Sequence, residues 1–179
     1  MKSTSFPTLT TERLLLRQIQ QDDIQNIFHG LSNRDVIKYY GISFASLEAT
    51  TAQMTWFKNL EATETGIWWA ICSKDNQLFY GAGGFNEWSK EHKKAEIGFW
   101  LLPDYWGKGF MQEAFPILCE YGFEQLDLNR IEGFVASENT NCKKAIEKMN
   151  FKREGTMREC EIKDGNYLNL AIYAKLRNR

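Results

Sequence analysis

Residues 103–111 read Pro103-Asp104-Tyr105-Trp106-Gly107-Lys108-Gly109-Phe110-Met111 and join an apolar segment to a segment with helical spacing. Gly107 and Gly109 allow the backbone here to turn tightly and to direct several N–H groups outward. At a helix N-terminus such N–H groups attract anions, and a pyrophosphate suits this arrangement. Lys108 adds a mobile positive charge. Because two glycines before a helix also serve simply as a tight connection, the stretch by itself is only a candidate anion site.

Hydrophobic spacing on both sides of this stretch predicts alternating strands and helices in a single domain over residues 1–179. Strands are predicted over 12–19, 67–72, 79–88, 95–102, 130–136, 151–160 and 166–175, and helices near 24–31, 47–60, 109–123 and 139–149. Ser46 and Asn139 are suitable helix caps, and Asn150 stands where a left-handed residue is expected to end the last helix. This order indicates an α+β or α/β layered fold.

The composition is that of a globular domain with a large core. Of 179 residues, 43% are hydrophobic, 25% are charged and 14% are aromatic. The formal net charge of −1 argues against a nucleic-acid binder, which should carry a basic excess. No uncharged apolar run approaches the ~20 residues of a membrane span, and the first residues lack the apolar core of a secretory signal. We therefore expect a soluble cytoplasmic protein with no membrane partner.

The cysteines and histidines do not form a recognisable metal-ligand set. No two cysteines are close enough for a CxxC pair, and the two histidines are far apart in the sequence. Disulfides are not expected in a chain of this length with so many core residues. The residues concerned are Cys72, Cys119, Cys142, Cys160, His29 and His92. We therefore predict neither a metal site nor redox chemistry.

Four stretches, in their order and spacing, carry a resemblance that covers nearly the whole chain. They are TERLLLR at 11–17, AEIGFW at 95–100, YWGKG at 105–109 followed by Glu113-Ala114, and LNRI at 128–131 continued by ENTN at 138–141 and KMNFKREG at 148–155. On these stretches the chain resembles the GNAT-superfamily N-acetyltransferases. Within them it is most similar to the branch of ribosomal-protein alanine N-acetyltransferases of the RimJ/RimL type.

The resemblance implies a GNAT-like central mixed, mostly antiparallel sheet of about seven strands flanked by about four helices. It also implies that acetyl-CoA, the cosubstrate, lies between two splayed central strands with its pyrophosphate on the loop 106–111. Backbone groups of Trp100 and Leu102 are expected to pair with the pantetheine like an added strand. Asn141 resembles the family residue that hydrogen-bonds the pantetheine or phosphate arm, although it could instead support a helix cap. The implied cofactor-binding residues are Trp100, Leu102, Trp106, Gly107, Lys108, Gly109, Phe110, Met111 and Asn141.

The chain departs from the family pattern at four positions. Trp106 and Met111 stand where the loop usually begins with Gln or Arg and ends with Gly or Ala. Because backbone N–H groups do most of the holding in such a loop, we expect cofactor binding to survive. Asn150 replaces a glycine at a left-handed position that Asn tolerates. Ile146 stands where many relatives carry a tyrosine general acid, so that acid is absent.

Glu96 is the residue that we expect to act as general base. With the period of two of a strand, its carboxylate shares a face with Trp100 and Leu102, where a charge is costly without a partner or a task. The resemblance places Glu96 where many GNAT enzymes carry their base. The alternative is an ion pair with a neighbouring strand, for example with Arg17 or Lys94. We favour the base.

Two residues are candidates for the acid that protonates the departing CoA thiolate. Cys142 stands where this branch usually has Ser, and a thiol of pKa ~8.5 is matched to that leaving group. Cys142 also belongs to a helical stripe with Ala145, Ile146 and Met149, which favours core packing instead. Tyr173, on the last predicted strand, is the second candidate, and a buried structural role is again the favoured interpretation.

The amine acceptor is the least determined part of the site. At pH 7 an α-amine of pKa ~8 costs roughly 1.4 kcal/mol to deprotonate, whereas a lysine-type amine costs about 4.6. A site with one base therefore favours an α-amine, and the resemblance implies a ribosomal-protein N-terminus. A small amine (polyamine, amino acid or antibiotic), or a non-catalytic acyl-CoA-binding module, remains an alternative, and both a monomer and a homodimer are compatible with the sequence. Candidate walls of the acceptor site are Tyr39, Tyr40, Trp56, Phe57, Trp68 and Trp69.

Overall fold

Eight strands form one sheet in the computed structural model, which describes residues 5–178. Their spatial order is β1-β2-β3-β4-β5-β6-β8-β7, and every neighbouring pair is antiparallel except β5 and β6. The mixed, mostly antiparallel sheet is thus confirmed, and the two-residue β1 is the strand that the sequence pattern misses. The strands are β1 (Leu9–Thr10), β2 (Leu14–Gln18), β3 (Ile67–Ser73), β4 (Phe79–Ser89), β5 (Lys94–Leu101), β6 (Arg130–Ala136), β7 (Lys152–Lys163) and β8 (Asn166–Leu176).

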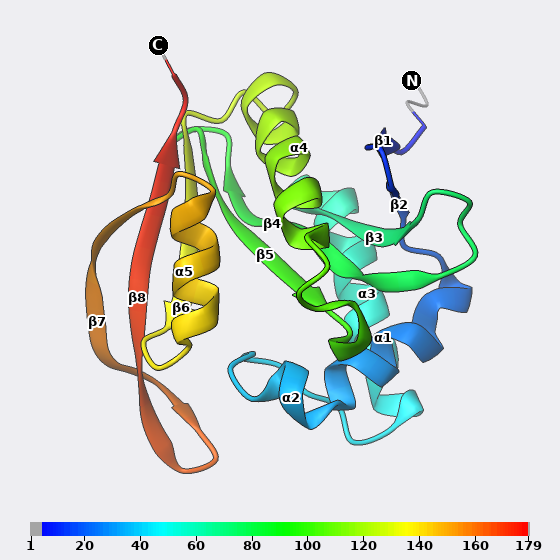
Figure 1. The fold of residues 1–179 in the computed structure, drawn as a ribbon, viewed down its shortest axis with the longest axis horizontal. Helices are drawn as coiled ribbons and strands as arrows, with labels where there is room; N and C mark the ends of the chain where they lie inside the picture. Colours follow the sequence, from blue (N-terminus) through cyan, green and yellow to red (C-terminus); the bar gives the residue numbers. More distant parts are fainter. Residues whose placement is uncertain (1–4, 179) are drawn as a thin grey trace.

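Five α-helices cover the two faces of this sheet (Figure 1). On one face α4 and α5 pack into the larger core cluster through residues such as Leu118 and Ile146. On the other face α1, α2 and α3 pack into a second cluster, which includes Leu31, Val36 and Phe57. The helices are α1 (Ile24–Ser32), α2 (Arg34–Ile37), α3 (Leu47–Thr63), α4 (Phe110–Glu124) and α5 (Thr140–Lys148). Hydrophobic spacing predicts all of them except the four-residue α2.

The expected helix ends are confirmed by their hydrogen bonds and backbone angles. The Ser46 hydroxyl accepts the Ala49 N–H at 3.1 Å and caps α3. The Asn139 side chain accepts the Cys142 N–H at 3.1 Å and caps α5. Asn150, with φ of 64°, has the left-handed conformation expected after α5. Local sequence therefore determines where α3 and α5 begin and where α5 ends.

The side chains of β5 alternate between the two core clusters, as the period of two predicts. Ile97 and Leu101 belong to the cluster under α4 and α5. Trp100 and the following Leu102 belong to the opposite cluster. β5 is therefore a central strand that is buried on both faces.

β5 and β6 pair over a short distance and then separate. Their parallel pairing covers three residue pairs, from Lys94–Arg130 to Glu96–Glu132. Beyond this point β6 continues along β8, whereas β5 continues along β4, and the two strands diverge (Figure 1). This divergence produces the splayed central strands that the resemblance implies. Within residues 5–178 no helix is both long enough and apolar enough to cross a membrane.

Candidate functional site

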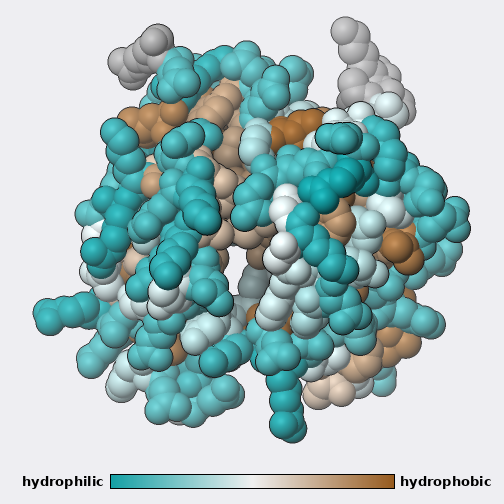
Figure 2. Space-filling model, in the orientation of Figure 1, coloured by the Kyte–Doolittle hydropathy of each residue, from teal (hydrophilic) through white to brown (hydrophobic). Residues whose placement is uncertain are grey.

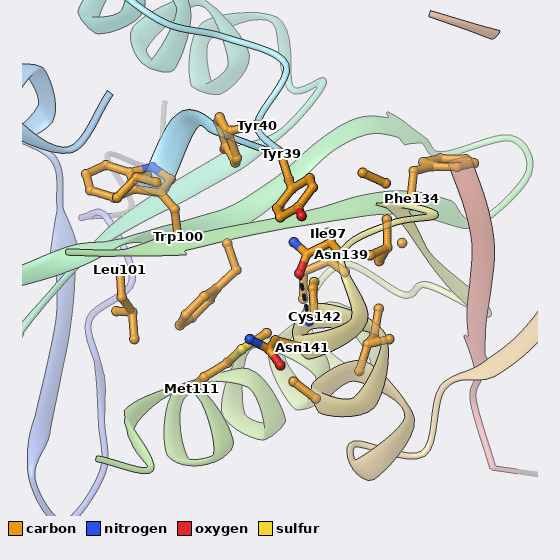
Figure 3. Close-up of a pocket in the computed structure, with 18 of the residues that line it drawn as sticks. Tyr39, Tyr40, Ile97, Trp100, Leu101, Met111, Phe134, Asn139, Asn141 and Cys142 are labelled. Atoms are coloured by element: carbon orange, nitrogen blue, oxygen red, sulfur yellow. Dashed lines mark hydrogen bonds between the residues drawn. The ribbon is translucent and has the colours of Figure 1, made fainter. Parts of the chain in front are cut away.

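A cavity of about 980 Å³ opens where β5 and β6 separate. Its walls come from β5, β6, the start of α4, the start of α5, and residues 35, 36 and 38–42 in and after α2. In Figure 2 the surface is hollowed between its two halves, and the background is visible through the opening. Figure 3 shows Tyr39 and Tyr40 entering the cavity from one side, and Met111 and Asn141 lying on the other. Because α2 and α4 cover opposite faces of the sheet, the cavity can be approached from both faces.

The glycine-containing loop has the backbone conformation of an anion cradle. Gly107 and Gly109 have φ of +71° and +79°, in the left-handed region that favours glycine. α4 begins at Phe110, so the free N–H groups of its first turn lie next to the loop. The predicted loop residues Trp106, Gly107, Gly109, Phe110 and Met111 all line the cavity. This combination suits the pyrophosphate of acetyl-CoA.

Lys108 is placed differently from its loop neighbours. It is exposed and is not among the described residues that line the cavity. Its ammonium lies 5.5 Å from the centre of the Tyr105 ring, in a cation–π contact. The positive charge of Lys108 therefore lies on the outer, solvent-exposed side of the loop and not among the described residues that line the cavity.

The backbone prediction for Trp100 and Leu102 needs a correction of one residue. The Leu102 N–H donates to the carbonyl of Tyr80 on β4 at 2.8 Å, and Trp100 is the register partner of Ala82 on the same strand. Backbone groups alternate in direction along an antiparallel strand, so those of Trp100 and Leu102 are directed to β4. Leu102 is also not among the described residues that line the cavity, whereas Trp100 is.

The open edge of β5 belongs instead to Phe99 and Leu101. These two residues have the opposite parity, so their backbone groups are directed to the side where β6 has separated. Both residues line the cavity. The Leu101 carbonyl accepts the indole N–H of Trp106 at 2.8 Å, which leaves the Phe99 groups and the Leu101 N–H for a ligand. A pantetheine arm laid along this edge would take the place of a missing strand.

Glu96 lies in the cavity, and its pKa is strongly perturbed. Burial raises the pKa of its carboxyl to about 7, and the negative charges of Glu87, Glu132 and Glu161 add to the rise. The neighbouring Asn86 amide offsets part of this effect. At neutral pH the carboxylate and the carboxylic acid are therefore both populated, as a group that accepts a proton during a reaction requires.

The alternative ion pairs for Glu96 are not formed among residues 5–178. The guanidinium of Arg17 binds Asp23, with Nη1 to Oδ2 at 2.7 Å. The ammonium of Lys94 binds Glu132 at 3.2 Å. Both expected partners are therefore engaged elsewhere, and Glu96 faces the cavity without a cation.

Tyr40 is the neighbour of Glu96 on the α2 side. Burial, and secondly the charge of Glu96, raises the pKa of the Tyr40 phenol. The phenol is therefore protonated at neutral pH and is available as a hydrogen-bond donor. Of the aromatic residues considered for the acceptor walls, Tyr39, Tyr40, Trp56 and Trp68 line the cavity. Phe57 and Trp69 belong to the two cores.

The start of α5 contributes two predicted residues with different environments. Asn141 is exposed and lines the cavity, and among residues 5–178 its side chain makes no hydrogen bond that would support the cap of α5, which Asn139 provides (Figure 3). Cys142 also lines the cavity and packs against the larger core cluster. Burial raises the pKa of the Cys142 thiol to about 11. The pKa of Cys142 therefore no longer matches that of the CoA thiol, as a general acid for this leaving group would require.

Tyr173 is far less accessible than a general acid should be. Its side chain is fully buried, and its hydroxyl donates to Oε1 of Glu147 at 2.8 Å. Burial and this carboxylate raise the pKa of Tyr173 to about 12. It is not among the described residues that line the cavity, which agrees with the structural role favoured above. Within residues 5–178 no group of three or more His, Cys, Asp or Glu side chains is placed to hold a metal ion.

Comparison with known proteins gives concordant matches. The family model of the acetyltransferase (GNAT) domain matches residues 13–152. The uncharacterized N-acetyltransferase YoaA of Bacillus subtilis (strain 168) is 34% identical over 175 residues, which cover 97% of this chain and 99% of YoaA.

Two solved structures of acetyltransferases share the fold. RimL, a ribosomal L7/L12 α-N-protein acetyltransferase in complex with coenzyme A, has a TM-score of 0.85 at 20% identity, covering 95% of this chain and 98% of that chain. A spermidine N-acetyltransferase from Vibrio cholerae, in complex with CoA and spermine, has a TM-score of 0.82 at 22% identity, covering 93% of this chain and 96% of that chain. At these identities the likeness shows a common architecture.

Proposed function

The chain belongs to the GNAT acetyltransferase family, and we propose that it transfers the acetyl group of acetyl-CoA to the α-amine of a peptide or protein, with Glu96 as general base. The observation that carries this proposal is the position of Glu96 in the cavity, with a pKa raised to about 7 and no cationic partner among residues 5–178. The remaining walls of the cavity supply places for both substrates.

The chain's own residues perform three tasks in the proposed reaction. The N–H groups of loop 106–111 bind the pyrophosphate, and the open backbone edge at Phe99 and Leu101 holds the pantetheine. The Glu96 carboxylate takes a proton from the acceptor ammonium, directly or through water. The neutral amine then attacks the thioester carbonyl carbon. A C–N bond forms, the C–S bond breaks and the CoA thiolate departs, and the nitrogen, which becomes positively charged on attack, loses a second proton to give the neutral amide.

Cys142 is a poor donor of the proton that the thiolate needs. Its thiol has a pKa of about 11, whereas an unperturbed thiol has a pKa of about 8.5. Transfer from Cys142 to a thiolate is therefore uphill, and we assign Cys142 to the packing of α5. Water at the open side of the cavity instead relays to the thiolate the proton that the acylated nitrogen loses.

The α-amine is the acceptor class that best matches one base of this strength. Deprotonating an α-amine at pH 7 costs about 1.4 kcal/mol, and deprotonating a lysine-type amine costs about 4.6. A carboxylate of pKa about 7 is nearly balanced against an α-amine of pKa about 8, so the proton transfer costs little. A ribosomal protein is one acceptor of this class, and RimL has that activity by name.

One observation favours a second candidate acceptor, a polyamine. Asp35 and Glu161 line the cavity together with Glu96, and Lys38 is the one basic residue among its described lining residues. An acidic approach stabilises an acceptor that carries more than one positive charge. The Vibrio cholerae spermidine N-acetyltransferase of similar fold is in complex with CoA and spermine.

Mass spectrometry of acetylated products separates these candidates. The protein is incubated with acetyl-CoA and two acceptor pools: short peptides with varied N-termini and blocked lysines, and a mixture of polyamines, amino acids and aminoglycosides. Products among the peptides are expected. Products only among small amines would replace the acceptor and keep the chemistry. Tight CoA binding with no acetylated product in either pool would instead support a non-catalytic acyl-CoA-binding module.

A further inference from the structure

Arg13, in the stretch TERLLLR, holds the glycine loop from outside the cavity. Its Nη1 donates to the carbonyl oxygen of Lys108 at 3.0 Å, and its Nε donates to Oε2 of Glu113 at 2.6 Å. The guanidinium carbon lies 4.6 Å from the centre of the Phe110 ring. Arg13 is not among the described residues that line the cavity. One side chain therefore contacts the middle of the loop and the first turn of α4 without reaching the ligand space.

Glu113 fixes the orientation of this guanidinium. Its Oε1 accepts the backbone N–H of Arg13 at 2.8 Å and also the hydroxyl of Thr11. Burial opposes ionisation of the Glu113 carboxyl, but the hydrogen bonds from Thr11 and Arg13 outweigh burial and hold its pKa below the usual range. The carboxylate remains charged and pairs with Arg13 in a fixed geometry.

The peptide bond between Lys108 and Gly109 connects this contact to the cavity. In a trans peptide the C=O and the following N–H point in opposite directions. Because Arg13 holds the Lys108 C=O on its own side, the Gly109 N–H points away from Arg13. Gly109 lines the cavity and has a φ of +79°, and a glycine without such a restraint samples many other conformations.

The other end of the loop is already fixed by Trp106. Its indole N–H donates to the Leu101 carbonyl at 2.8 Å, which ties the first loop residue to the end of β5. Between this anchor and Lys108 stands only Gly107. The Arg13 contact is thus the restraint that determines the direction of the last free peptide before α4.

We propose that Arg13 is a positioning residue for acetyl-CoA, which it orders by holding the Lys108 carbonyl outward while Glu113 aligns its guanidinium. Arg13 acts through the loop, so it determines the affinity for CoA and leaves the chemical step untouched. Arg13 has this role whichever amine the protein acetylates, because only the family's cosubstrate contacts the loop.

The substitution Arg13→Lys tests this role, since it keeps the charge and removes the planar fork. We expect the Kd for CoA, measured by calorimetry, to rise about 5- to 20-fold. The KM for acetyl-CoA should rise in parallel, while kcat at saturation and the KM for the acceptor stay within about twofold of wild type. Glu113→Gln should weaken CoA binding in the same direction, and the double variant should be no weaker than the worse single variant, because the two residues act as a unit.

Arg177→Lys is the matched control. Arg177 also binds a glutamate of α4, Glu124, at 3.2 Å, but at the opposite end of the helix. Its replacement should leave the Kd for CoA unchanged. An unchanged Kd in folded Arg13→Lys and Glu113→Gln would overturn the proposal, as would a loss of kcat with an unchanged Kd. If Arg13→Lys fails to fold, Glu113→Gln alone decides. Since the calorimetric arm needs no acceptor, it stands even if the proposed acceptor is wrong.

Discussion

Glu96 and Glu132 are direct neighbours across the parallel pairing of β5 and β6, yet among residues 5–178 only Glu132 has cationic partners. Glu132 accepts from Arg130 at 2.7 Å and from Lys94 at 3.2 Å. Burial opposes ionisation of Glu132, but these contacts outweigh it and lower its pKa, whereas burial raises the pKa of Glu96 to about 7. Two adjacent carboxylates are therefore pushed in opposite directions, and the uncompensated one faces the cavity. Such a separation is typical of residues with acid–base roles.

Replacing the base should remove turnover and keep cosubstrate binding. We expect Glu96→Gln to lower kcat by about 10²- to 10⁴-fold, because the acceptor ammonium then has no positioned group to receive its proton. The Kd for acetyl-CoA should stay close to that of wild type. Steady-state kinetics and calorimetry measure the two quantities, and Glu120→Gln, at an exposed position of α4, is the matched control. Unchanged turnover in Glu96→Gln would remove this residue from the mechanism.

The rate should depend on pH through the ionisation of Glu96. Only the carboxylate can accept a proton, so kcat should rise with pH and level off above an apparent pKa of about 7. The profile is best measured with saturating acceptor between pH 5.5 and 8.5, so that the titration of the free amine does not contribute. A profile that is flat over this range contradicts the assignment.

The same shift predicts a cost in stability above neutral pH. The folded-state pKa of Glu96, about 7, lies above the ordinary value of 4.5, so the native state binds the proton more tightly between these two values. Stability therefore falls as pH rises through that window. Glu96→Gln should be more stable than wild type at pH 8, by up to about 3 kcal/mol, and equally stable near pH 4.5. Urea unfolding at the two pH values measures the difference, and equal gains at both would contradict the pKa shift.

The hairpin of β7 and β8 should affect the binding of the acceptor amine and not the binding of acetyl-CoA. At the end of β7 the Lys163 ammonium donates to the carbonyl of Tyr40 at 2.7 Å, to that of Lys38 at 3.3 Å, and to that of Ile37. These bonds hold the segment that carries Tyr39 and Tyr40 over the cavity.

The substitution Lys163→Met removes these three bonds. We expect the KM for the acceptor to rise about 5- to 10-fold, since the loss of a charge-assisted anchor frees the segment, while the Kd for CoA is unchanged. Lys152→Met, at the exposed start of β7, is the control. A parallel loss of CoA affinity in Lys163→Met would show a general structural defect.

The sequence predicts the regular part of the fold because local signals and burial agree there. The caps Ser46 and Asn139 and the left-handed Asn150 act within a few residues, and the alternation of β5 follows from burial on both faces. α2 escapes prediction because its four residues are too short for a hydrophobic stripe. Its end is instead stabilised by Lys163, more than 120 residues away in the sequence.

For the site, the sequence predicts which residues lie near one another but not which backbone groups are available to bind a ligand. The cavity contains nearly all the predicted loop residues and Glu96. The direction of the β5 backbone groups depends on the register with β4, which is a long-range property. The sequence therefore predicts Trp100 and Leu102 as the residues with open backbone groups, whereas these groups belong to Phe99 and Leu101. The role of the motif residue Arg13 also cannot be predicted from the sequence, because its contact with the Lys108 carbonyl joins two segments that are far apart in the chain.

The three residue pairs between β5 and β6 are the only ladder contacts that the described residues provide between the two parts of the sheet. On the open side, the amide hydrogens of Phe99 and Leu101 have no neighbouring strand to shield them from solvent exchange. A ligand along this edge would shield these hydrogens from solvent and would connect β5 to the part of the sheet formed by β6, β8 and β7. Deuterium uptake should therefore slow on binding at both margins of the gap, in strands that are far apart along the chain.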